Sequence, residues 1–210
     1  MRSILAGVVM VAVSVGVARS ETILLGAQVG AGHLPMNEWE DFAGFTYQHD
    51  RLGLYSEFSV TSRFAQRHAL RFSLEWIKTS SSETTSVQGI GDITVEWDFE
   101  AIPFSASYEF ALRQSASDAF TLLGVGAGYY MSDVTGKISG GTNPSTGERS
   151  GEGYGFHGYV RQTAPISEQL SLSGMLRGRW ANGMAFDDNE GDVAVEFTGV
   201  DVSIGLEWEI

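Results

Sequence analysis

Charged side chains recur at every second position in several segments of this chain, each beside apolar residues. Arg71 and Glu75 stand between leucine, phenylalanine and tryptophan residues, and Glu207 has similar neighbours near the C-terminus. Groups of opposite charge on one face can neutralise each other in an enclosed space, or can line a path for ions. An unpaired charge in such a space is costly, so ion pairing is the first expectation.

His157 suggests a second kind of chemistry, because a histidine can activate a serine as a nucleophile. No motif ties it to a particular serine, and it shares its face with Tyr159 and Arg161. The remaining histidines lack the spacing of metal ligands; they are His33, His49 and His68. We therefore expect no catalytic, cofactor-binding or metal-binding residues.

The elements that carry these residues have the periodicity of β-strands. In the last eleven residues, apolar and polar side chains alternate strictly. The apolar face holds Val200, Val202, Ile204, Leu206, Trp208 and Ile210, and the other face holds Asp201, Ser203, Gly205, Glu207 and Glu209. A period of two is the signature of a strand. One wholly apolar face opposite a charged face indicates that the two faces meet different surroundings.

The first twenty residues have the features of a cleaved secretory signal peptide. A positive charge near the start precedes an apolar run from Ile4 to Val17, and small residues come before Glu21. The run is too short for a transmembrane helix, which needs about 20 residues. We expect cleavage after Ala18 or Ser20, which leaves residues 21–210 as one domain.

Composition narrows the choice of partners. The chain has no cysteine, so disulfides contribute nothing even to an exported protein. Its 26 acidic and 13 basic residues give a formal net charge of −13, and every acidic residue lies beyond residue 20. A nucleic-acid partner is therefore excluded, because its phosphates need a basic surface.

Short and long connectors alternate between the strand-like segments. The short ones are Ser62 to His68, Gln114 to Asp118 and Ala164 to Gln169; the long ones lie near His33 and at Thr79 to Gly91, Ser132 to Gly153 and Asn182 to Gly199. Short turns at one end and long loops at the other are typical of transmembrane barrels. Aromatic residues also stand near the ends of apolar faces: Trp76, Trp97, Tyr129, Trp180 and Trp208. Because lipid requires internal pairing of backbone groups, we predict an all-β fold, a closed antiparallel transmembrane β-barrel, with a soluble β-sandwich as the alternative.

The number of strands depends on two segments in which the alternation breaks. The pattern changes phase near His49 to Arg51, and again at Glu100 to Pro103, where a turn or a bulge would be needed. Counting Phe42 to Val60 and Asp92 to Arg113 as one strand each gives eight strands, and splitting both gives ten. We favour eight, because this count keeps Thr79 to Gly91 at the end with the other long loops.

Three stretches carry a resemblance to a known family. They are FTLLGVGAGYY (Phe120 to Tyr130), LRGRWANG (Leu176 to Gly183) and the C-terminal alternation of Leu206, Trp208 and Ile210. With these, the chain resembles the small outer-membrane barrels of the OmpA/OmpX kind. The resemblance implies a Gram-negative outer-membrane protein that the barrel-assembly machinery recognises through Leu206, Trp208 and Ile210. Such proteins usually end in phenylalanine, whereas this chain ends in isoleucine.

With the apolar faces outward, one set of polar side chains should face the barrel interior. It comprises Gln28, Glu57, Arg71, Glu75, Glu96, Asp98, Glu109, His157, Tyr159, Arg161, Arg177, Arg179, Asp201, Glu207 and Glu209. An eight-stranded barrel is just wide enough for side chains to fill it. We expect a charge network in which Arg177 and Arg179 pair with Glu207 and Glu209, joined by Arg71, Glu75, Glu96, His157 and Arg161.

This interior predicts a non-enzymatic barrel with a structural or surface-interaction role, displaying mobile loops and contacting outer-membrane lipid and lipopolysaccharide as a monomer. Because acids outnumber bases, a narrow porin-like channel that prefers cations is the alternative. A barrel enzyme that modifies lipid A is a third hypothesis. It would need a nucleophile and its base at the lipid-facing edge.

Overall fold

The computed structural model describes residues 22–33, 36–42, 45–49, 52–65, 67–87, 91–114, 119–140, 144–186 and 193–210. The predicted signal peptide, residues 1–20, lies outside this range. In the described part of the chain no helix is long and apolar enough to cross a membrane.

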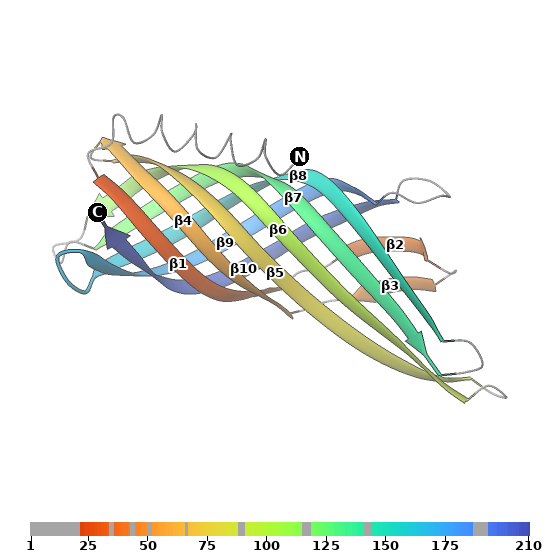
Figure 1. Ribbon diagram of the computed structural model, residues 1–210. Coiled ribbons are helices and arrows are strands. Elements are labelled where there is room, and N and C mark those ends of the chain that lie inside the picture. Colours follow the sequence, from red (N-terminus) through yellow and green to blue (C-terminus); the bar gives the residue numbers. More distant parts are fainter. Residues whose placement is uncertain are drawn as a thin grey trace.

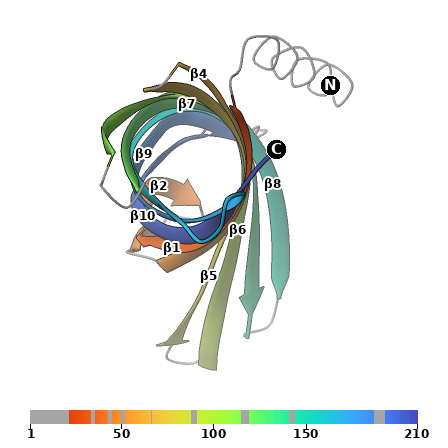
Figure 2. The same cartoon turned by 90° about the vertical axis from the view of Figure 1, so that its left-hand side faces the viewer.

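Eight antiparallel strands form a closed ring (Figures 1 and 2). They are β1 (Thr22–His33), β4 (Leu52–Ala65), β5 (His68–Val87), β6 (Gly91–Gln114), β7 (Phe120–Ser139), β8 (Ser145–Pro165), β9 (Leu170–Phe186) and β10 (Val193–Glu209). Each strand pairs with the next, and β1 pairs with β10 to close the ring. The predicted all-β, closed antiparallel barrel of eight strands is confirmed.

The two ends of the barrel differ, as the alternation of connectors predicts. At one end, here called the turn end, β4, β6 and β8 are followed closely by β5, β7 and β9, and both β1 and β10 have their terminal ends there. The ring is closed up to the last residue, because the amide of Ile210 donates to the carbonyl of Ile23 at 3.0 Å. The other end, here called the hairpin end, carries the connections that the sequence suggested were long loops.

Phe42 to Val60 is not one strand. Two further strands follow β1 in the sequence and precede β4: β2 (Met36–Phe42) and β3 (Phe45–His49). They pair with each other, and β2 also pairs with β10 at two positions. They lie outside the eight-stranded ring, so the preferred count was right although this segment was divided wrongly.

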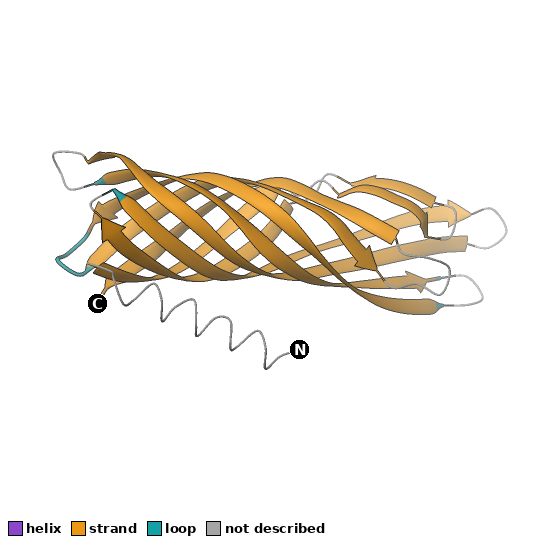
Figure 3. Cartoon of the chain, turned by 90° about the horizontal axis from the view of Figure 1, so that it is seen from above, coloured by secondary structure: helices purple, strands orange, loops and turns teal. Residues whose placement is uncertain are grey.

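The predicted long loops are mostly strand. Thr79 to Val87 continues β5 and pairs with the start of β6, and most of Ser132 to Gly153 pairs β7 with β8. The segment Asn182 to Gly199 likewise includes the ends of β9 and β10. Serine, threonine and glycine suggested loops there, but paired neighbours extend the strands well beyond the closed ring, as Figure 3 shows.

Apolar side chains cover the outside of the barrel from the turn end to its middle. Val202 and Ile204 on β10 are 60% and 56% exposed, and Phe58 on β4 is 67% exposed. The side chains between them point inward and are buried. For the central part of the strands this confirms the prediction that the apolar side chains face outward and the polar side chains face the interior.

Nearer the hairpin end the polarity of the two faces is reversed. On β6, Phe99 and Ala101 are buried inside the barrel, whereas Asp98 is exposed on its outside. The strand runs through Pro103 without a shift of register. The predicted turn or bulge at Glu100 to Pro103 is therefore wrong. The polar and apolar side chains exchange faces there, while the strand continues unbroken.

Candidate functional site

Seven residues of the predicted charge network lie buried inside the barrel. They are Arg71, Glu75, His157, Arg161, Arg177, Arg179 and Glu207. Three further carboxylates from the predicted inner face join them, namely Glu57, Glu109 and Asp201. The alternation of each strand turns these side chains inward, and six strands supply the charged groups.

Near the turn end, Arg161 of β8 is the centre of the ion pairs. Its Nε and Nη2 donate to the two carboxylate oxygens of Glu109 on β6, at 3.0 and 2.5 Å. It also pairs with Glu207 of β10. Glu207 accepts a second bond, of 3.0 Å, from Nη1 of Arg71, which lies on β5. These contacts cross the interior and do not follow neighbouring strands alone.

Nearer the hairpin end, Arg177 of β9 holds a second group of carboxylates. Its Nη1 and Nη2 each donate to Glu75 of β5 at 2.9 Å, and its Nε lies 3.2 Å from Oδ1 of Asp201. Arg179 contacts the same two acids, at 3.0 Å to Glu75 and 2.6 Å to Asp201.

Glu57 joins the two groups. One of its oxygens accepts from Nη2 of Arg71 at 2.7 Å, and the other accepts from Nη1 of Arg177 at 3.0 Å. Five buried carboxylates and four arginines thus form one continuous network through the barrel. We call these nine residues the ionic layer: Glu57, Arg71, Glu75, Glu109, Arg161, Arg177, Arg179, Asp201 and Glu207.

The predicted pairing of Arg177 and Arg179 with Glu207 and Glu209 is wrong. Register decides this, because Arg177 lies opposite Asp201 and Glu207 lies opposite Ser171. Glu209 is exposed at the turn end and is not part of the ionic layer.

Glu96 and Asp98 also lie elsewhere than predicted. Both are on the outside of the barrel near the hairpin end, where Glu96 forms an exposed pair of 3.2 Å with Lys137 of β7. The sequence placed them inside because their apolar neighbours were assumed to face lipid.

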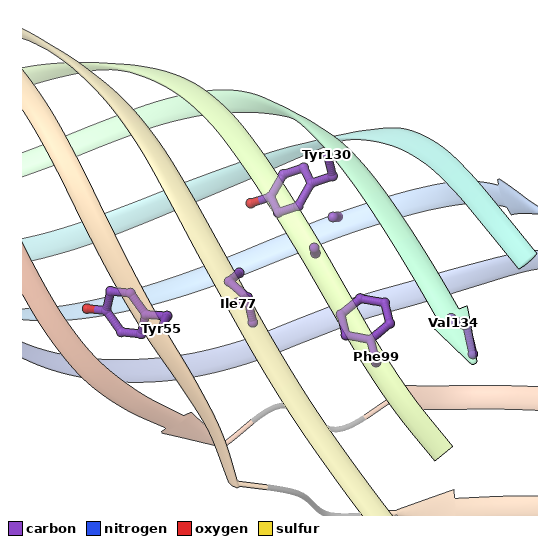
Figure 4. Packing of buried hydrophobic residues seen from close by; sticks show 7 residues of the cluster. Tyr55, Ile77, Phe99, Tyr130 and Val134 are labelled. Atoms are coloured by element: carbon purple, nitrogen blue, oxygen red, sulfur yellow. The ribbon is translucent and has the colours of Figure 1, made fainter. Parts of the chain in front are cut away.

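An apolar cluster lies inside the barrel, nearer the hairpin end than the ionic layer. Figure 4 shows its side chains. Its members are Tyr55, Ile77, Phe99, Ala101, Tyr130, Val134 and Ala181. On β4, β5, β6 and β9 these residues are nearer the hairpin end than the charged residues of the same strand. Trp97, predicted on the lipid face, instead packs partly buried against this cluster. We call the cluster the apolar layer; the two layers fill the interior in series.

Sequence reasoning missed a serine next to His157. The hydroxyl of Ser107 on β6 lies 2.7 Å from Nε2 of His157 on β8, and both residues are buried. The two strands flank β7, where Gly126 leaves room between them. A serine beside a histidine is a possible nucleophile and base, but this pair faces the barrel interior and not the lipid-facing edge. Among the described residues no group of histidine, aspartate or glutamate side chains could hold a metal ion.

No protein-family model matches the sequence, and neither does any curated protein. Solved structures do match. The outer membrane protein OprG of Pseudomonas aeruginosa shares 10% identity at a TM-score of 0.58, over 91% of this chain and 97% of that one. A major outer membrane protein of Thermus thermophilus gives 13% and 0.56, over 90% and 99%. Neisserial surface protein A gives 13% and 0.50, over 89% and 97%. This chain has the fold of the small outer-membrane barrels, as the resemblance implied.

Proposed function

We propose that this chain is an outer-membrane protein with a closed interior, whose role is to present a sheet edge to partners outside the cell. The exposed apolar band and the barrel fold support the membrane location. The turn end would then face the periplasm and the hairpin end the exterior. The protein belongs to no enzyme class in this proposal.

The observation that carries the proposal is the free edge of β5. The pairing of β4 with β5 begins at the facing residues Ala65 and His68 and ends at Leu54 and Lys78. Beyond Lys78, in the described residues, Thr79–Val87 of β5 pairs only with β6. The outer parts of β5, β6, β7 and β8 therefore form a four-stranded sheet that projects from the ring, as Figure 2 shows. An unpaired edge exposes backbone donors and acceptors that an extended peptide can use.

Proline substitutions along the edge test this role. Alternate residues of β5 direct their amides toward β6 or toward the free edge, and proline removes the donor. Single proline variants at each position from Ser80 to Thr85 should therefore fall into two sets. In one set the lost amide pointed toward β6 and the β5–β6 hairpin is disturbed; in the other it pointed toward the free edge and the hairpin stays intact. Displayed peptides that were selected for binding to the detergent-solubilised wild-type protein should not bind the variants of the second set. Equal binding by every folded proline variant would contradict the proposal.

A narrow cation-preferring pore is the second candidate, and the excess of one carboxylate in the ionic layer favours it. The two filled layers argue for a closed interior instead. A steady single-channel conductance of the wild-type protein, abolished by Arg177→Glu, would favour the pore.

Lipid modification is the third candidate. The position of Ser107 and His157 inside the barrel argues against it, because an acyl chain in the membrane has to reach the nucleophile. Lipid A from a strain overproducing the protein should be unchanged by mass spectrometry. An altered acyl pattern that disappears in Ser107→Ala would contradict this assignment.

A further inference from the structure

The turn end has a small pocket at the mouth of the barrel, next to the part of the ionic layer that holds Glu109, Arg161 and Glu207. Arg63 at the end of β4 and Arg67 in the following turn both line it, together with His68 and Phe120. Small apolar side chains, among them Ala69 and Ala111, complete its walls. The turn is held in place because the carbonyl of Arg67 accepts a hydrogen bond of 2.9 Å from the amide of Ala111.

These two arginines differ from the arginines of the ionic layer. Each of those four pairs with buried carboxylates, whereas neither Arg63 nor Arg67 forms an ion pair with another described residue. The guanidinium of Arg63 instead lies over the ring of Phe120, 5.2 Å from its centre. An aromatic ring holds a guanidinium in place without neutralising its charge.

The outer wall beside the pocket carries aromatic side chains. The His68 ring stacks on Phe64 and contacts Phe110 at 5.3 Å between centres, and its Nδ1 is hydrogen bonded to the hydroxyl of Tyr108. Aromatic residues with a polar tip are typical of the membrane–water interface. Thus the pocket opens where lipid headgroups and periplasmic solutes are both within reach.

We propose that this pocket binds a phosphate group through Arg63 and Arg67. Two guanidinium groups offer parallel donors that match the oxygens of a phosphate. The group could come from a phospholipid headgroup of the inner leaflet or from a soluble phosphate ester. The proposal relies on the proposed function only for the statement that this end faces the periplasm.

Alanine amides can report binding, because Ala69 and Ala111 line the pocket. Protein labelled with ¹⁵N-alanine in maltoside micelles, which contain no phosphate, is titrated with inorganic phosphate or with short-chain phosphatidylglycerol. Saturable shifts of the Ala69 and Ala111 signals are expected, while Ala127 in the middle of β7 stays unchanged. Shifts with phosphatidylglycerol alone would assign the site to a headgroup, and shifts with inorganic phosphate would assign it to a soluble ligand.

Substitutions identify the residues responsible. Arg63→Gln and Arg67→Gln should each weaken binding about tenfold or more, as expected for loss of a charge-assisted bond. Lys137→Gln removes one positive charge at the opposite end and serves as the matched control. Heat-modifiable migration on gels verifies that each variant is folded. No saturable shift with either source, or equal shifts in wild type and both arginine variants, would overturn the proposal. Proline variants of the β5 edge should leave the titration unaltered, so the two proposals can fail separately.

Discussion

The ring of Tyr159 on β8 occupies the space that a side chain on Gly124 of β7 would need. A β-carbon at Gly124 would lie 2.1 Å from Cζ of Tyr159, and the Tyr159 hydroxyl donates to Glu109 at 2.7 Å. Glycine on β7 thus lets a tyrosine from β8 reach across to a carboxylate on β6. The geometry of the ionic layer therefore depends on glycine at position 124 as well as on the charged residues.

Gly124→Ala should therefore destabilise the barrel by about 1–3 kcal/mol, the usual cost of overpacking. The tyrosine ring has to move, and its bond to Glu109 is lost. Urea unfolding in lipid vesicles, followed by gel migration, measures the change. Gly178→Ala on β9 is the matched control, because nothing lies within 4 Å of an added β-carbon there. Equal stability of the two variants would contradict the packing argument.

Glu57→Gln should destabilise the folded protein by about 3–5 kcal/mol, because it removes one partner from a buried ion-pair network. Arg71 and Arg177 would both lose a charged acceptor. Glu96→Gln makes the same chemical change in the exposed pair with Lys137, and it should cost at most about 1 kcal/mol. The two free energies of unfolding can be compared in one urea series, and a loss in Glu96→Gln as large as that in Glu57→Gln would argue against the assignment of layers.

Ion conduction should require the disruption of both layers, because they lie in series. In planar bilayers, the wild-type protein, Arg177→Gln and Phe99→Ala should each show no steady conductance. The combined variant should conduct, provided that it migrates as a folded barrel. Conductance in either single variant would show that only one layer closes the interior.

Membrane assembly should depend on the apolar end of β10. Trp208 and Ile210 are 49% and 68% exposed on the outer face, so they contribute apolar surface without packing in the interior. Trp208→Ser with Ile210→Ser should block insertion, seen as loss of heat-modifiable migration and of protease protection. Glu209→Ser lies between them and should insert normally. Normal insertion of the double variant would leave the proposed assembly signal without support.

The sequence predicted the fold well where lipid and interior impose opposite demands on the two faces. In Val200 to Glu207 the strict alternation identified both the strand and its buried acids. The same rule failed for Glu96 and Trp97, because on this part of β6 the polar side chains face outward and the apolar side chains face the interior. Composition also misled, since serine and threonine in Thr79 to Val87 form a paired strand.

Partners in the ionic layer were harder to predict than its members. Inward direction follows from alternation along one strand, but pairing depends on the register of neighbouring strands and on contacts across the ring. Arg177 meets Asp201 because of register, and meets Glu75 across the interior. Neither relation can be read from spacing along the chain.

The reversal of polarity has a consequence for how deeply the protein sits in a membrane. Ile77 and Ala101 pair across β5 and β6 and both point inward, and the next pair, Lys78 and Glu100, points outward. On β7, Asp133 pairs with Glu100 and also points outward. Three neighbouring strands thus end their apolar outer surface at the same height. In the membrane location proposed above, this row of charges would set the immersion depth of the barrel, so a thicker bilayer would have to thin locally around it before the sheet beyond the row entered lipid.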